Sequence, residues 1–257
     1  MKRYFLLMAV FAAGTAHAWG WGDCEHERTV EATLNLEGSE TLAIRAAAGD
    51  LRVTGRSGTS QAKATGKICA SDEEWLEESK LVTDEGKEAR IAVSLPDSSG
   101  WTFMGNQYLY MDLEIEVPDH IALDIRDSSG DMKVENTASV RIQDSSGDIN
   151  LEDVKGAVTL EDSSGDIDLL DITGDVVVVR DSSGDIRGRD IEGSVRVEKD
   201  SSGDIRFRNV SADFVVEKDS SGDIVADGIG GDFRVLKDSS GDIRSSGVTG
   251  EVDVPSD

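Results

Sequence analysis

The hexapeptide Asp-Ser-Ser-Gly-Asp-Ile recurs along the second half of the chain at nearly constant spacing. Successive copies begin 17, 18 and then repeatedly 19 residues apart. Self-similarity at such a short period is typical of stacked repeat architectures. The residues between the copies vary, so recent duplication alone does not explain the constant hexapeptide, and we infer a physical role for it. The copies begin at Asp127 (ending in Met132 instead of Ile), Asp144, Asp162, Asp181, Asp200, Asp219 and Asp238.

Each repeat contains two short stretches in which apolar and polar residues alternate. In the repeat that begins at Asp200, Ile205 and Phe207 belong to the first stretch, and Phe214 and Val216 to the second. Alternation with a period of two predicts β-strands with one buried face. The second pair recurs at a fixed offset before each later hexapeptide, so we expect equivalent apolar side chains to stack in columns.

A unit of this length with two strands cannot bury its apolar face alone, but stacking of similar coils about 4.8 Å apart buries it. We therefore predict an all-β chain that forms a parallel β-solenoid, similar to a single-stranded β-helix, with about 19 residues per coil. An antiparallel meander is the alternative. It would need strong turn chemistry at both ends of each unit, and only the hexapeptide end has it.

Three regions are expected along the chain. They are a signal peptide at 1–18, a less regular and mostly β N-terminal region at 19–117, and the repeat solenoid at 118–257. No Pro-rich or Ser-rich linker separates the last two, so we expect them to share one continuous core.

Within the N-terminal region the apolar pattern predicts several elements. Residues 41–45, 50–54 and 109–117 alternate as strands do. Residues 71–81 are expected to form one short helix, capped by Ser71 or Asp72 and with acidic residues in its first turn.

The first residues have the features of a secretory leader. Lys2 and Arg3 precede an apolar run, and the segment ends in Ala16-His17-Ala18. The apolar run is too short to span a membrane, and no later apolar stretch approaches the length that spanning requires. We expect cleavage near Ala18, export to the periplasm or the cell surface, and a mature chain without a transmembrane segment.

The chain has two cysteines, Cys24 and Cys69. An even pair in an exported protein favours a disulfide over free thiols or a metal pair.

The net charge of the chain is −26, and removal of the basic leader residues makes it more negative. A surface this acidic repels nucleic acid and favours cationic partners, so no nucleic acid is expected as a partner.

The sequence resembles the bacterial DUF4097 family of β-strand-repeat proteins, which are often labelled adhesins. The resemblance begins at about residue 28 and rests on Gly49-Asp50-Leu51, on the strand that ends at Val117-Pro118, and on the Ser-Gly-Asp-Ile units. It implies an exported or envelope-associated β-solenoid. It supplies no catalytic residues.

The hexapeptide itself fits a type I β-turn, with Asp at the first position and Gly at the fourth. The first Asp can accept hydrogen bonds from backbone N–H groups one or two residues later, and Gly tolerates a positive φ. The second Asp is expected to point outward and Ile inward. Stacking then produces outward ladders of Asp and Ser, and the first interpretation of the motif is a structural corner.

Calcium binding is the alternative interpretation, because two Asp columns place like charges about 5 Å apart and calcium prefers oxygen ligands. Neighbouring basic residues can also reduce the repulsion between these carboxylates, so calcium is possible but not required. These residues are Arg126, Arg180, Lys199, Lys218 and Lys237 before the motif, and Lys133, Arg187, Arg206 and Arg244 after its second Asp. The carboxylates that would bind calcium are Asp144, Asp148, Asp162, Asp166, Asp181, Asp185, Asp200, Asp204, Asp219, Asp223, Asp238 and Asp242.

Catalysis has little support in the sequence. After cleavage only His26 and His120 remain, and neither lies in the repeats with the serines. Carbohydrate-active β-helix enzymes use clustered carboxylates, but here every repeat carries the same acids, whereas a catalytic site normally departs from the repeat.

The sequence therefore predicts an exported, non-enzymatic, adhesin-like binding or scaffold module of the bacterial cell envelope, with no catalytic residues and no cofactor unless calcium binds. The alternatives are a carbohydrate-active parallel β-helix enzyme and a calcium-binding repeat protein. The expected partner is an envelope component, a glycan or a cationic peptide. Pro255 removes a backbone donor from the last unit, which favours a monomer.

Overall fold

The computed structural model describes residues 24–96 and 107–255. The expected signal peptide at 1–18 lies outside these residues. The regular elements of the described chain are strands, apart from one short helix, which confirms the all-β fold class. The elements that precede the repeats are β1 (His26–Asn35), β2 (Thr41–Arg45), β3 (Leu51–Arg56), β4 (Gln61–Ala70), α1 (Glu73–Glu78), β5 (Lys80–Asp84), β6 (Glu88–Ser94) and β7 (Leu109–Pro118).

In the repeats, each coil contributes one strand to each of two sheets. The strands that follow the hexapeptides are β9 (Met132–Thr137), β11 (Ile149–Val154), β13 (Ile167–Ile172), β15 (Ile186–Ile191), β17 (Ile205–Val210), β19 (Ile224–Ile229) and β21 (Ile243–Ser246). The strands of the opposite sheet are β8 (Ala122–Arg126), β10 (Val140–Gln143), β12 (Val158–Glu161), β14 (Val176–Arg180), β16 (Val195–Val197), β18 (Phe214–Val216), β20 (Phe233–Val235) and β22 (Val252–Asp253).

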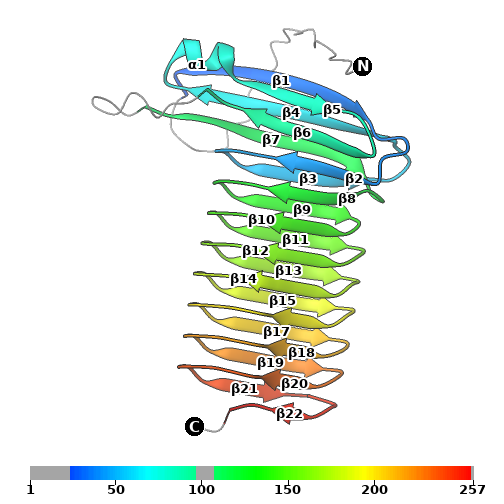
Figure 1. The fold of residues 1–257 in the computed structure, drawn as a ribbon, viewed down its shortest axis with the longest axis vertical. Helices are drawn as coiled ribbons and strands as arrows, with labels where there is room; N and C mark the ends of the chain where they lie inside the picture. Colours follow the sequence, from blue (N-terminus) through cyan, green and yellow to red (C-terminus); the bar gives the residue numbers. More distant parts are fainter. Residues whose placement is uncertain (1–23, 97–106, 256–257) are drawn as a thin grey trace.

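Both sheets contain 11 strands, and in the repeats every neighbouring pair is parallel and comes from successive coils. The register places equivalent residues side by side, so Ile149 lies next to Ile167 and Ile167 next to Ile186. Figure 1 shows the result, a stack of coils along one long axis. This confirms the predicted parallel β-solenoid.

The N-terminal strands continue the same stack. β2 lies parallel between β6 and β8, and β3 lies parallel between β7 and β9. Antiparallel strands β1 and β4 then extend one sheet, and β5 extends the other. One cluster of buried apolar side chains runs from these strands into the repeats. The expectation of a continuous core is therefore confirmed.

Aromatic side chains fill the core of the later coils. Phe207, Phe214 and Phe233 are fully buried, and their successive ring centroids lie 4.9 and 5.3 Å apart. Gly188 makes this packing possible, because a Cβ atom there would lie 2.1 Å from the ring of Phe207. A small residue in one coil thus matches a large one in the next, as close packing requires.

The helix is shorter than the sequence predicted. α1 ends at Glu78, with Asp72 as its N-cap, whereas the prediction extended it to Leu81. Leu81 lies instead in β5, which pairs with β6. The helix stops because the backbone N–H and the hydroxyl of Ser79 both bond to the carbonyl of Trp75, and β-branched residues that favour a strand follow.

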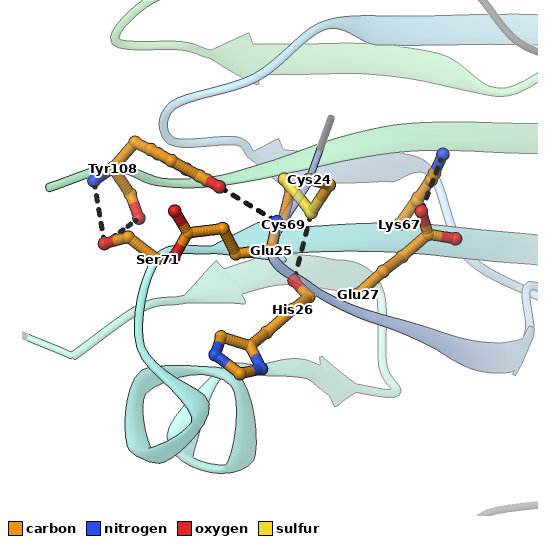
Figure 2. The surroundings of a disulfide bond; sticks show 8 residues. All are labelled: Cys24, Glu25, His26, Glu27, Lys67, Cys69, Ser71 and Tyr108. Carbon is orange, nitrogen blue, oxygen red and sulfur yellow. Dashed lines mark hydrogen bonds and ion pairs between the residues drawn. A yellow bond between two sulfur atoms is a disulfide. The ribbon is translucent and has the colours of Figure 1, made fainter. Parts of the chain in front are cut away.

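A disulfide joins Cys24 to Cys69, with their Cα atoms 5.8 Å apart, as predicted. Figure 2 shows that it connects the segment before β1 to the end of β4. Beside it, the backbone N–H of Glu25 donates to the hydroxyl of Tyr108 at 2.9 Å. The start of the described chain is therefore fixed to the antiparallel end of the sheet. Among the residues described, no helix is long and apolar enough to cross a bilayer.

Replacing both cysteines by serine (Cys24→Ser with Cys69→Ser) is expected to lower the free energy of unfolding by up to about 4 kcal/mol, because the bond closes a loop of 45 residues in the unfolded chain. Urea denaturation measures the change. A reducing agent should reproduce the loss in the wild type and leave the double variant unaffected. Equal stability of the two proteins would contradict the expected contribution.

Candidate functional site

The hexapeptide forms one corner of each coil, between a strand of one sheet and the next strand of the other. Its first Asp closes the turn. The Oδ1 atoms of Asp181, Asp200 and Asp219 accept the backbone N–H of the following serine at 2.7, 2.6 and 2.6 Å. Oδ1 of Asp219 also accepts the N–H of Ser221 at 3.2 Å. These bonds confirm the predicted role of the first Asp in the turn.

This first Asp column is buried, which corrects the expectation that both Asp columns face the solvent. The carboxyl group turns inward to reach the N–H groups of its own turn, and the neighbouring coils then cover it. Asp238, in the final hexapeptide, remains partly exposed. The buried members are Asp127 and Asp144, each 6% exposed, and Asp162, Asp181, Asp200 and Asp219, each 0% exposed.

The basic residues that precede the hexapeptide do not neutralise this column. Their side chains are exposed, because consecutive residues of an extended segment face opposite sides. Arg180, for example, lies 3.9 Å from Glu161 on the surface. The prediction that these bases balance the first Asp column is therefore wrong. The residues concerned are Arg126, Arg180, Lys199, Lys218 and Lys237.

Two constraints require the glycine of the hexapeptide. Its φ lies between 117° and 136° in all seven copies, a region that residues with a side chain rarely adopt. A Cβ atom at Gly203 would also lie 1.7 Å from the carbonyl oxygen of Gly184 in the preceding coil. Gly49 has a φ of 119° and lies against Gly130 in the same way. The segment Gly49-Asp50-Leu51 is therefore a divergent first copy of the corner.

The second serine ties each coil to the preceding one. The hydroxyl of Ser202 donates to the carbonyl oxygen of Ser182 at 3.1 Å, and the hydroxyl of Ser221 donates to that of Ser201 at 3.2 Å. Other coils repeat the bond, so these hydroxyls hold the stack together. The other donors are Ser146, Ser164, Ser183 and Ser240.

The second Asp of the hexapeptide forms an outward ladder that links the coils. Oδ1 of Asp185 accepts the backbone N–H of Asp204 at 2.9 Å, and Oδ1 of Asp204 accepts that of Asp223 at 2.7 Å. The same contact begins before the repeats and continues to the last hexapeptide. The ladder consists of Asp112, Asp50, Asp131, Asp148, Asp166, Asp185, Asp204, Asp223 and Asp242.

Arginines neutralise part of this outward ladder. Nη1 of Arg187 lies 2.7 Å from Asp166 of the preceding coil, and Arg187 also contacts the Asp of its own coil. Arg206 and Arg244 make the same two contacts. The backbone N–H of the next coil, together with Arg187, lowers the pKa of Asp166. Three of the four predicted outward bases thus act as expected, whereas Lys133 pairs with two glutamates.

The corner shows no ready-made metal centre. Within 24–96 and 107–255, no three acidic, His or Cys side chains gather as ligands for an ion. Calcium normally takes six to eight oxygen ligands. The Oδ1 atoms of the outward ladder already accept backbone N–H groups, so the hexapeptide is explained by its structural contacts.

The two histidines within the described residues lie apart from the repeats. His26 begins β1, and His120 lies in the turn between β7 and β8. Nδ1 of His120 is 3.7 Å from Asp119, and the side chain is exposed. In the part of the chain that the structure describes, neither imidazole is hydrogen-bonded to a serine hydroxyl.

The opposite corner of the coils carries a groove that the sequence prediction missed. It has a volume of about 670 Å³ and follows successive coils from the end of β11 to β21. Its floor includes buried Val154, Ile191, Val210 and Ile229. Before the floor residue of each coil stand Asp153, Asp171, Asp190, Asn209, Gly228 and Gly247. After it stand Lys155, Thr173, Glu192, Ser211, Gly230 and Thr249.

The backbone explains the first of these two columns. Asp153, Asp171, Asp190 and Asn209 have φ between 54° and 58°, in the left-handed region that Asn, Asp and Gly adopt most readily. Nδ2 of Asn209 also donates to Oδ1 of Asp190 at 2.7 Å. The recurrence of Asn, Asp or Gly at one offset in every repeat was the sequence signal that could have located this corner.

A family model described as Toastrack DUF4097 matches residues 71–201. Three solved structures align with the chain, and each alignment covers 89% of it. A protein provisionally described as an adhesin from Bacteroides fragilis has 10% identity, 97% of its own chain covered and a TM-score of 0.46.

The second solved structure, provisionally described as a lipid-binding protein from Parabacteroides distasonis, has 18% identity, 97% coverage and a TM-score of 0.42. The third, provisionally described as a cell adhesion protein from Clostridium sporogenes, has 13% identity, 99% coverage and a TM-score of 0.34. No curated protein matches the chain.

Gly203→Ala is expected to destabilise the solenoid by at least about 3 kcal/mol, because the new methyl group meets the backbone of the preceding coil and φ is positive. Gly58→Ala is the matched control. Gly58 also has a positive φ, 75°, but open space surrounds it, so only the backbone term of about 1–2 kcal/mol applies. Thermal unfolding compares the two, and equal losses would show that contact between coils contributes nothing.

Proposed function

The chain belongs to the Toastrack DUF4097 family, and on that premise we propose that it is an exported, non-enzymatic, adhesin-like binding or scaffold module of the bacterial cell envelope. The observation that carries the proposal is the corner groove, defined as the concavity of about 670 Å³ along the corner opposite the hexapeptides. It is long and open to solvent, with an apolar floor between two columns of mostly polar residues. At the hexapeptide corner, by contrast, the Asp and Ser side chains form hydrogen bonds within the turn and between neighbouring coils.

The shape of the corner groove favours an extended ligand. The groove runs along the stack, so a new set of lining residues follows at each coil, about every 4.8 Å, and both columns are polar from Asp153 to Ser211. A linear polymer can contact several coils at once, which adds weak contacts along its length. We propose a glycan chain as the ligand, because carboxylate, amide and hydroxyl groups such as those of Asp171, Asn209 and Thr173 can all accept hydrogen bonds from sugar hydroxyls.

The carboxylates of the corner groove are the groups on which the alternative function, a carbohydrate-active enzyme, would depend. Asp153, Asp171 and Asp190 lie in adjacent coils, and paired carboxylates are the catalytic groups of most glycoside hydrolases. Their left-handed backbone explains why Asp occurs there, so their presence needs no catalytic role. Release of reducing ends from a bound glycan would establish the enzyme instead of the binding module.

A cationic peptide is the second candidate ligand, and the net charge of −26 favours it. Attraction between exposed charges falls with ionic strength, because the screening length shrinks to about 8 Å at 0.15 M salt. Binding of a neutral glycan should change little between low and high salt. A steep loss of affinity with added salt would select the cationic peptide.

Export is part of the proposal and has its own test. The protein recovered from the producing bacterium is expected to begin at Trp19 and to be found in the periplasmic or surface fraction, because the leader has the charged, apolar and small-residue parts of a signal peptide. Intact mass and cell fractionation measure this. Full-length chain in the cytoplasm would contradict export.

Filling the groove tests the binding function directly. Thr173→Trp with Ser211→Trp places two large side chains at exposed groove positions and is expected to reduce glycan binding at least tenfold without loss of stability. Soluble oligosaccharides released from the bacterial envelope serve as the probe in titration calorimetry. Lys199→Trp is the matched control, exposed at the hexapeptide corner, and should bind like the wild type. Equal binding by all three proteins would exclude the groove as the site.

A further inference from the structure

The inward Asp column is the least expected feature of the core. It is defined here as Asp127, Asp144, Asp162, Asp181, Asp200 and Asp219. The exposed fraction of these residues is 6% or less. Carboxyl groups are rarely buried this far without a partner. Their recurrence in successive coils makes the column a property of the fold and not of one residue.

Each carboxyl group of the column has an oxygen without a hydrogen-bond partner. One oxygen of Asp181, Asp200 and Asp219 serves the turn, and the other, Oδ2, is buried and unpartnered. In Asp144 and Asp162 both oxygens lack a partner. A buried polar atom without a partner calls for a proton, a water or an ion that satisfies it.

The charged groups that face the column are acids. Neighbouring members of the column face one another, as Asp181 and Asp219 do on either side of Asp200. From the outward ladder, Asp50 acts on Asp127, Asp148 on Asp162, Asp166 on Asp181 and Asp204 on Asp219. The basic residues that precede the hexapeptides point to solvent.

Full ionisation of such a column is strongly unfavourable. Successive carboxyl groups are one coil apart, about 4.8 Å, and burial removes the water that would screen them. Two carboxyl groups this close normally share one proton, since the ionised form of one raises the proton affinity of the other.

We propose that the inward Asp column is a proton-binding site in which neighbouring carboxyl groups share protons between coils. A protonated carboxyl group in one coil donates its O–H to a carboxylate oxygen of the next. The spacing of the coils leaves room for one short O–H···O bond, about 2.5–2.7 Å between oxygens. Such bonds would satisfy the unpartnered oxygens, and the column would couple the stability of the solenoid to external pH.

The pKa directions support this geometry. Burial is the largest cause and neighbouring carboxylates add to it, so that the pKa of Asp127 and Asp200 rises to about 7 and that of Asp144 and Asp181 to about 6, although the turn N–H groups oppose the rise. The ordinary value is 3.8. Because these values are raised in the folded chain, the stabilisation is complete below pH 4 and is lost as the pH rises through 6 to 7.

A cation is one alternative species that could satisfy these oxygens. Calcium prefers six to eight oxygen ligands. Within the described residues no group of three potential metal ligands gathers at the column. A proton needs only two oxygens, and for this reason we assign the column to protons.

The decisive experiment follows the melting temperature between pH 5 and pH 8. The wild type is expected to lose about 5 °C or more over this range, since its protons are released. Asp181→Asn with Asp200→Asn keeps an oxygen for each turn and supplies an N–H donor in place of the proton. This variant should melt higher than the wild type at pH 8 and lose at most half as many degrees.

Asp223→Asn with Asp242→Asn is the matched control on the outward ladder. It should keep the full decrease, because these groups have exposed oxygens and share Arg244 as a partner. A wild-type melting temperature that does not fall from pH 5 to pH 8 would overturn the proposal. So would a wild-type stability at pH 8 that rises with millimolar calcium and falls with a chelator.

Infrared spectroscopy gives a readout that does not require the variants to fold. Protonated carboxyl groups have a C=O absorption distinct from that of carboxylates. The wild type at pH 7 should show this absorption and lose it at pH 9. Its absence at pH 7 would exclude shared protons.

Discussion

The stack of coils depends on how closely two backbones approach at the hexapeptide corner. Each hexapeptide glycine packs against the carbonyl of the glycine in the preceding coil, and a Cβ atom at Gly222 would lie 1.7 Å from that oxygen. This contact fixes the spacing at which parallel strands can pair on both sides of the core. The serine hydroxyls, the Asp ladder and the buried Ile column all repeat at the spacing that the glycine permits.

The close approach of the two backbones also explains why the first Asp of each hexapeptide is buried whereas the second faces the solvent. At the tight corner the first Asp turns inward to satisfy its own turn, whereas the second lies outward and satisfies the next coil. One carboxyl column therefore loses contact with water and the other retains it. The corner that holds the coils together therefore also buries six carboxyl groups, which is energetically unfavourable.

The features that depend on local pattern could be predicted from the sequence. The 19-residue spacing and the alternation at Ile205 and Phe207 predicted the solenoid and its core columns, and the even cysteine pair, together with the expected export, predicted the disulfide. The rest depends on contacts between distant segments. The end of α1 is decided by pairing of β5 with β6, and the burial of Asp200 by the coils above and below it. The groove arises only when left-handed residues of several coils align.

The outward Asp ladder gives the stack a direction. From Asp50 onward, each carboxylate accepts an N–H group of a coil that comes later in the sequence, so a finished coil offers an acceptor to the next segment of chain. The series begins at Asp112 and Asp50, in the part of the fold that the disulfide anchors. A chain that emerges N-terminus first can therefore add coils one at a time onto an existing template. The direction of the ladder therefore favours vectorial growth of the stack from its N-terminal end.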